Sequence, residues 1–121
     1  MEKEKIIKEV FESLLEYLPK IIIGIEKNID LFRQDREEEA VNLLIQVIEG
    51  LQWIFTVLGQ TTETLKSNGI EVDASRINDV FIELLDGVKN QDYVLVTDLM
   101  EYEMLDILKD LKLRLENKSI D

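Results

Sequence analysis

The sequence predicts an all-α protein, an antiparallel up-down bundle of four helices. Apolar residues recur three and four positions apart along most of the chain, and no segment shows the two-residue alternation of a β-strand. Short polar or glycine-containing stretches separate four such segments, so that sequential helices become antiparallel neighbours. With 121 residues, of which 45% are hydrophobic, residues 1–121 are expected to form a single domain with a buried core.

The first helix is expected over residues 3–33. Pro19 lies inside it, removes one backbone hydrogen bond and crowds the carbonyl group of Leu15, which predicts a kink or a short break. The kink is favoured because the apolar face continues without a change of phase. That face consists of Ile7, Phe11, Leu14, Leu18, Ile21, Ile25, Ile29 and Phe32.

The second helix is expected over residues 36–67. Asp35 and Glu38 have the spacing of a capping box at its start. Gly69, just beyond its end, can adopt the left-handed conformation that terminates helices, with Ile70 folding back on the last turn. The predicted buried face consists of Val41, Leu44, Ile48, Leu51, Phe55, Leu58, Thr62 and Leu65.

A shorter third helix is expected over residues 75–89, with Asp73 or Ser75 as its N-cap, and a fourth over residues 92–116. The third helix presents Ile77, Val80, Phe81, Leu84, Leu85 and Val88 on its apolar face. The fourth presents Tyr93, Val96, Met100, Met104, Ile107, Leu111 and Leu115.

The composition excludes several functions. The chain has 26 acidic and 14 basic residues and a net charge of -12, which argues against binding to nucleic acid or to an anionic membrane. It has no Cys and no His, which removes disulfides, thiolate chemistry and the usual general base, and we expect no cofactor. The N-terminus alternates Glu and Lys rather than forming a signal peptide, and the densest apolar segment, residues 21–25, is too short to span a membrane. We therefore expect a cytoplasmic protein without a membrane partner.

Two pairs of acidic residues raise an enzymatic alternative. Glu83 with Asp86, and Asp98 with Glu101, resemble the Mg²⁺ motif of the all-α nucleotide pyrophosphohydrolases, which implies a Mg²⁺-dependent nucleotide hydrolase. At 100° per residue, however, Glu83, Asp86 and Asp98 point away from the apolar faces. The initial Glu pair and the nearby basic residues of that motif are also absent. Two solvated acidic faces are therefore the preferred interpretation.

Glu103 lies close to the apolar face of the fourth helix, so its carboxylate is expected to be partly buried. Burial without a partner costs stability, and a Lys, a Tyr hydroxyl or a backbone donor could supply one. Glu103 is then either a structural ion pair at the edge of the core or a polar anchor in a binding cleft.

Five residues lie away from the main apolar faces: Ile23, Gly50, Trp53, Val57 and Tyr102. In one interpretation they fill gaps left by the kinked first helix and the short third helix. In the other they form the interface with a protein partner or with a second copy of the chain, with Trp53 and Tyr102 as aromatic anchors.

Four glycines within the predicted helices invite an explanation: Gly24, Gly50, Gly59 and Gly87. Close approach of neighbouring helices is the simplest, because glycine is unfavourable in a helix. Gly50 could instead open a small groove beside the indole of Trp53.

Three segments resemble those of an uncharacterised family of small bacterial helical proteins. They are Tyr17-Leu-Pro-Lys20 leading to Gly24-Ile-Glu26, Ile48-Glu-Gly-Leu-Gln-Trp53, and the segment from Asp92 to Glu103 that includes Asp-Leu-Met-Glu-Tyr-Glu. The resemblance implies an all-α fold and carries no activity. The function expected from the residues is a non-enzymatic interaction module, an adaptor or chaperone-like bundle that could form a homodimer, and the hydrolase is the alternative.

Overall fold

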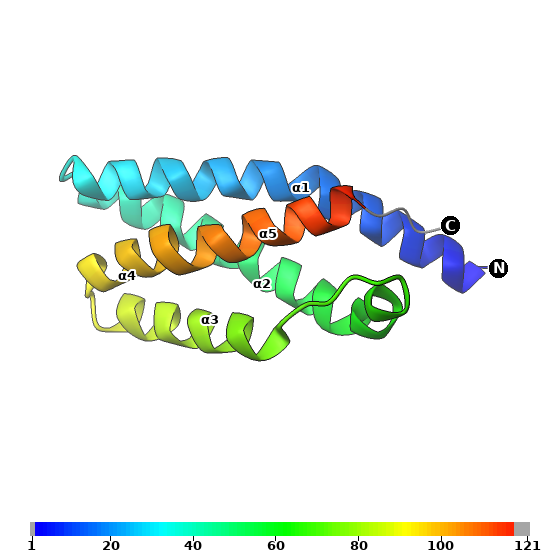
Figure 1. The fold of residues 1–121 in the computed structure, drawn as a ribbon. Helices are drawn as coiled ribbons and strands as arrows, with labels where there is room; N and C mark the ends of the chain where they lie inside the picture. The colour runs from blue at the N-terminus through cyan, green and yellow to red at the C-terminus, as the bar shows by residue number, and fades with distance from the viewer. Residues whose placement is uncertain (1, 118–121) are drawn as a thin grey trace.

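The chain forms an all-α bundle in the computed structural model, which describes residues 2–117. The helices are α1 (Glu2–Arg33), α2 (Glu37–Ser67), α3 (Ala74–Lys89) and a last helix in three consecutive parts, α4 (Tyr93–Leu99), the π-helix η1 (Met100–Met104) and α5 (Leu105–Glu116). Each successive helix runs back along the one before, so the start of α1 and the end of α5 lie at the same end of the bundle (Figure 1). Residues 2–117 include no strand, which confirms the predicted fold class.

The first helix continues through Pro19 without a break. Its N-terminal part tilts relative to the rest (Figure 1). The predicted apolar face is buried from Phe11 to Ile29, whereas Phe32 is only partly buried. The Ile7 side chain lies outside the described residues.

The end of α2 has the predicted geometry. Gly69 has a φ of 79°, in the left-handed region, and the Ile70 N–H donates to the carbonyl oxygen of Leu65 at 2.9 Å. The Gly69 N–H donates to Lys66, and Ile70 is buried. These two bonds satisfy carbonyl groups that the last turn of a helix would otherwise leave unpaired.

The predicted capping box at the start of α2 is wrong. Asp35 has a φ of 58° and its side chain does not cap α2, whose N-cap is Arg36. Asp35 instead ends α1 in the manner of Gly69, because the Arg36 N–H donates to the carbonyl oxygen of Leu31 at 3.0 Å. Gln91, with a φ of 55°, ends α3 in the same way.

Asp73, one of the two N-caps predicted for the third helix, caps α3, and Asp92 caps α4. A side-chain oxygen of Asp73 accepts from the Arg76 N–H at 3.1 Å, and one of Asp92 accepts from the Leu95 N–H at 3.2 Å. Each carboxylate satisfies a backbone donor of a first helical turn and lies where the helix dipole favours negative charge.

The buried face of α2 is rotated from the one predicted. Val41, Ile48 and Phe55 are only partly buried. The reason is that α2 packs closely along α1, whereas it meets α3 through long side chains, such as the edge-to-face pair Phe55–Phe81 with ring centroids 5.2 Å apart. The buried residues of α2 are Ala40, Leu44, Val47, Gly50, Leu51, Ile54, Val57, Leu58, Thr61 and Leu65.

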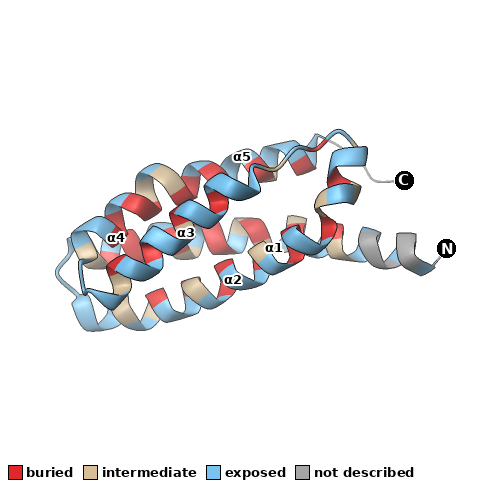
Figure 2. Cartoon of the chain, turned by 90° about the horizontal axis from the view of Figure 1, so that it is seen from below, coloured by how far each residue is buried: buried red, intermediate tan, exposed pale blue. Residues whose placement is uncertain are grey.

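The last turns of α2 bend away from the rest of the helix (Figures 1 and 2). Thr61 and Thr62 each donate a side-chain hydrogen bond to the carbonyl group four residues earlier, an interaction that bends helices. Gly59 precedes them, and glycine also weakens a helix locally.

Among the described helices, α2 alone is long and apolar enough to cross a membrane by length and composition. Helices that are buried in the core of soluble proteins pass the same test. Only 33% of its most apolar 18-residue window is buried inside the bundle, so much of α2 is exposed.

The last helix departs from the regular α-helix that the sequence predicts. Four side chains of this helix are 0% exposed: Val96, Met100, Met104 and Leu108. Each follows the one before by four residues. Each such step rotates a side chain by about 40° in an α-helix. The wider turn of η1 reduces this rotation, so that all four side chains reach the core. The buried residues of the bundle lie between the helices in Figure 2.

Candidate partner-binding surface

The exposed side of α2 carries almost no charge. Between Glu39 and Glu63 the sole charged residue is Glu49, although 33% of the chain is charged. We call the exposed residues of this stretch the outer face of α2: Asn42, Ile45, Gln46, Glu49, Gln52, Trp53, Thr56, Gly59 and Gln60.

The exposed sides of α1 and α5 have the charged character expected of a soluble protein. On α1 the exposed residues include Glu12, Glu16, Lys20, Glu26, Lys27 and Asp30. On α5 they include Asp106, Lys109, Asp110 and Arg114. The outer face of α2 therefore differs in charge from the exposed sides of α1 and α5, and protein interfaces are depleted of charged residues at their centres.

Trp53 is the largest side chain on this face and is 42% exposed. Its indole packs edge to face against the ring of Tyr17 from α1, with centroids 5.3 Å apart and planes at 84°. Tyr17 in turn lies across Gly50, because a Cβ atom at residue 50 would be 2.3 Å from the Tyr17 hydroxyl oxygen. Glycine at position 50 is thus what allows the two rings to meet.

The two rings line an open hollow of about 410 Å³, which we call the Trp53 hollow. Its other lining residues are Ser13, Glu16 and Lys20, all from α1. The ammonium group of Lys20 lies 4.0 Å from a carboxylate oxygen of Glu16, and both side chains are exposed. This hollow differs from the groove that Gly50 could have opened beside the indole, because Tyr17 covers Gly50 and the other walls come from α1.

The structure separates the five residues that the sequence grouped as an interface. Gly50 and Val57 are buried within the bundle, so they fill the core rather than a surface. Ile23 on α1 is 65% exposed and Tyr102 on η1 is 66% exposed. Neither of these two lines the Trp53 hollow, and isolated apolar side chains are common on protein surfaces.

Close approach explains two of the four helical glycines. A Cβ atom at Gly87 would lie 2.9 Å from Val96 of α4, as one at Gly50 would clash with Tyr17. One at Gly24 would make only an ordinary contact at 4.0 Å, and one at Gly59 would have no neighbour within 4 Å. Close packing therefore does not account for Gly24 or Gly59.

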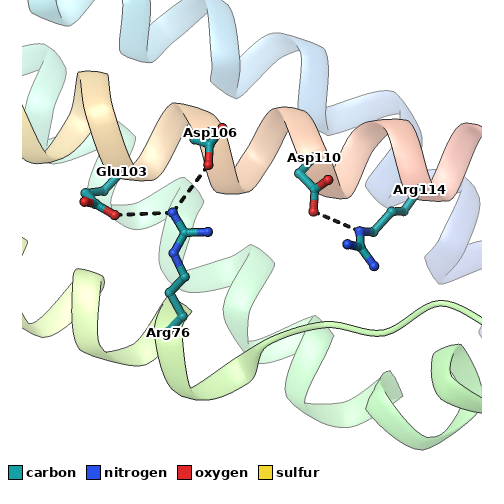
Figure 3. Close-up of polar contacts among 5 residues, drawn as sticks. All are labelled: Arg76, Glu103, Asp106, Asp110 and Arg114. Carbon is teal, nitrogen blue, oxygen red and sulfur yellow. Dashed lines mark hydrogen bonds and ion pairs between the residues drawn. The ribbon is translucent and has the colours of Figure 1, made fainter.

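Glu103 is half-buried and pairs with Arg76 of α3, a partner that the sequence did not suggest. The guanidinium group of Arg76 lies 3.3 Å from the Glu103 carboxylate and 3.4 Å from that of Asp106 (Figure 3). These hydrogen bonds raise the pKa of Arg76, and the bond with Glu103 contributes more than the bond with Asp106.

A hollow of about 470 Å³ opens between α3 and α5, beside the pair of Arg76 and Glu103. Arg76 and Arg114 line it, whereas Glu103 does not. Arg114 pairs with Asp110 at 2.8 Å (Figure 3). Both arginines thus have carboxylate partners, and Glu103 acts as a structural ion pair in this geometry.

The four acidic residues of the enzymatic alternative do not gather. Glu83, Asp86 and Asp98 are exposed, and Glu101 pairs with Arg33 of α1. Among residues 2–117 no group of three or more acidic side chains could hold a metal ion. The geometry gives no observation in favour of that alternative.

Two structural features were not predicted from the sequence. The stretch of α2 without charge is visible in the sequence itself as the interval between Glu39 and Glu63. Asn28 is fully buried between α1 and α2, where its Nδ2 donates to the carbonyl oxygen of Ala40 at 2.7 Å. The position of Asn28 between the buried Ile25 and Ile29 could have indicated this burial.

Comparison with known proteins gives one match. A family model described as a domain of unknown function (DUF8042) matches residues 9–114, from α1 through most of α5. No curated protein and no solved structure matches the chain. The expected resemblance to an uncharacterised family agrees with this match.

Proposed function

We propose that this chain, which belongs to the DUF8042 family, is a non-enzymatic protein-interaction module whose outer face of α2 binds a helix of a protein partner or of a second copy. In this proposal it acts as an adaptor or chaperone-like bundle in the cytoplasm of a bacterium. The bacterial setting is proposed from the resemblance to small bacterial helical proteins.

The observation that carries the proposal is the exposed stretch without charge. Transfer of a charge out of water has a high free-energy cost, whereas amide and hydroxyl side chains can form hydrogen bonds across an interface. Gln46, Gln52 and Thr56 are of this kind, and Ile45 and Trp53 supply apolar area. From Asn42 to Gln60 the face is ~27 Å long at 1.5 Å per residue, which suits a partner helix packed alongside.

The test adds one charge to the face and one elsewhere. Gln46→Glu places a carboxylate on the outer face of α2, and Asn78→Glu adds the same charge on the exposed side of α3. Both variants should melt within about 2 °C of the natural chain, since exposed substitutions usually change stability by less than 0.5 kcal/mol.

Sedimentation measures self-association, and co-purification from the native host measures binding to another protein. Gln46→Glu should weaken the observed association about tenfold or more, because it buries an unpaired charge. Asn78→Glu should leave it unchanged. Equal association of the two variants refutes the proposal, and so does flotation of the natural chain with uncharged lipid vesicles, which would make the face a membrane-binding surface.

A further inference from the structure

The angle between Tyr17 and Trp53 has the geometry of a cation site. The two ring planes meet at 84°, and a group lying in the angle of such a T-shaped pair contacts the face of each ring. The face of an aromatic ring carries the negative part of its quadrupole and attracts cations. The Trp53 hollow, at about 410 Å³, has room for the end of a long side chain.

The charges around the Trp53 hollow also favour binding of a cation. Glu16 lies at its rim, and the chain as a whole carries a net charge of -12. A cation is therefore attracted to this surface from a distance and held by a carboxylate on arrival. Lys20 opposes a second cation, but its exposed pair with Glu16, at 4.0 Å, is of the weak kind that a guest can displace.

Tyr17 is held in place by the close approach described above. Its hydroxyl lies over Gly50 and its ring is fixed against Trp53. The angle thus exists before a guest arrives, which avoids the entropic cost of ordering two aromatic side chains on binding.

We infer that the Trp53 hollow binds a cationic side chain, an arginine or a lysine, at the angle between Tyr17 and Trp53 beside Glu16. This inference rests on the proposed function and gives the partner helix its chemistry. The helix that lies on the outer face of α2 carries a basic residue that reaches over Trp53 toward α1.

The test uses two small probes that differ in charge alone. N-acetyl-arginine amide and N-acetyl-citrulline amide have nearly the same shape, and citrulline is neutral. Trp53 is the sole tryptophan of the chain, so its fluorescence and its indole N–H resonance report directly on the hollow. The arginine probe should bind about two- to fivefold more tightly than the citrulline probe.

Two variants at the rim give effects of opposite sign. Glu16→Gln should weaken binding of the arginine probe, and Lys20→Met should strengthen it, because one removes the carboxylate and the other removes the competing ammonium group. An apolar guest would respond to neither charge. Melting curves of both variants should match that of the natural chain, since both residues are exposed.

Equal binding of the two probes, or a Lys20→Met variant that binds the arginine probe no better, overturns the inference. The probe experiment and the Gln46→Glu experiment test the cation site and the helix-binding face separately. If Gln46→Glu weakens association while the probes fail to discriminate, the docking face remains and the cation site is refuted. If the probes discriminate while Gln46→Glu has no effect, the site stands without the helix-binding surface.

Discussion

Two glycines of the same helix are expected to respond in opposite directions to the same substitution. Gly50 and Gly59 both lie in α2, and replacing either with Ala raises helix propensity by about 1 kcal/mol. At Gly59 the new methyl group meets no atom within 4 Å. Gly59→Ala should therefore stabilise the protein by close to that amount, which raises Tm by about 4 °C for a chain of this length.

At Gly50 the new methyl group would lie 2.3 Å from the hydroxyl oxygen of Tyr17 and 2.8 Å from Cδ1 of Ile21. Tyr17 must move away and lose its contact with Trp53, which costs about 0.5–1.5 kcal/mol, and crowding of the core adds about 1–3 kcal/mol. After the gain in propensity, Gly50→Ala should destabilise the protein by about 0.5–3.5 kcal/mol. Tm should then fall by about 2–14 °C.

Thermal unfolding followed by circular dichroism measures both shifts, and the fluorescence of Trp53 reports whether Tyr17 has moved. Adding Tyr17→Phe should recover part of the loss in Gly50→Ala, because it removes the hydroxyl oxygen nearest the new methyl group. A rise in Tm of equal size for Gly50→Ala and Gly59→Ala would refute the assignment of Gly50 to close packing.

Three further substitutions test the backbone, the polar core and the ion pair. Gln91→Gly should raise the unfolding free energy by about 0.5–1 kcal/mol in urea titrations, because a φ of 55° is unfavourable for a residue with a Cβ atom; no gain would contradict the left-handed assignment. Asn28→Asp should destabilise by about 3 kcal/mol or more at neutral pH, because it buries a carboxylate beside the carbonyl group of Ala40. Burial raises the pKa of such a carboxyl in the folded state, so stability should be lost as pH rises through that pKa, and unfolding measured between pH 4 and 8 should show the decline. Arg76→Met should leave the midpoint of urea unfolding nearly unchanged, because its ion pairs are exposed. Arg76 is cationic in the unfolded state, and its raised pKa keeps it cationic in the folded state, so the difference between Arg76→Met and the natural chain should not vary between pH 6 and 9.

The helix ends show where local sequence is sufficient. Gly69 with Ile70, and Asp73, act as predicted because each depends on residues within the same turn. Asp35 fails for a related reason: the same residue can cap the next helix or end the previous one, and here it ends α1. The spacing to Glu38 is compatible with both roles.

The packing of the helices could be predicted less well from the sequence, because it depends on residues far apart in the chain. The half-burial of Ile48 and Phe55 follows from the distance between α2 and α3, which no local pattern encodes. Periodicity does place Trp53 away from Leu51, on the exposed side. The contact between Tyr17 and Trp53 depends on the register between α1 and α2. That register determines where the candidate site lies.

The π-helix has a consequence for comparing members of the family. A helix with such a turn holds one more residue than a regular α-helix that joins the same two ends. Met100–Met104 can therefore lose a residue while Val96 on one side and Leu108 on the other keep facing the core. An alignment gap of one residue within this segment would mark a change between π and α winding rather than a change of fold, whereas the same gap within α5 would turn its apolar face toward solvent.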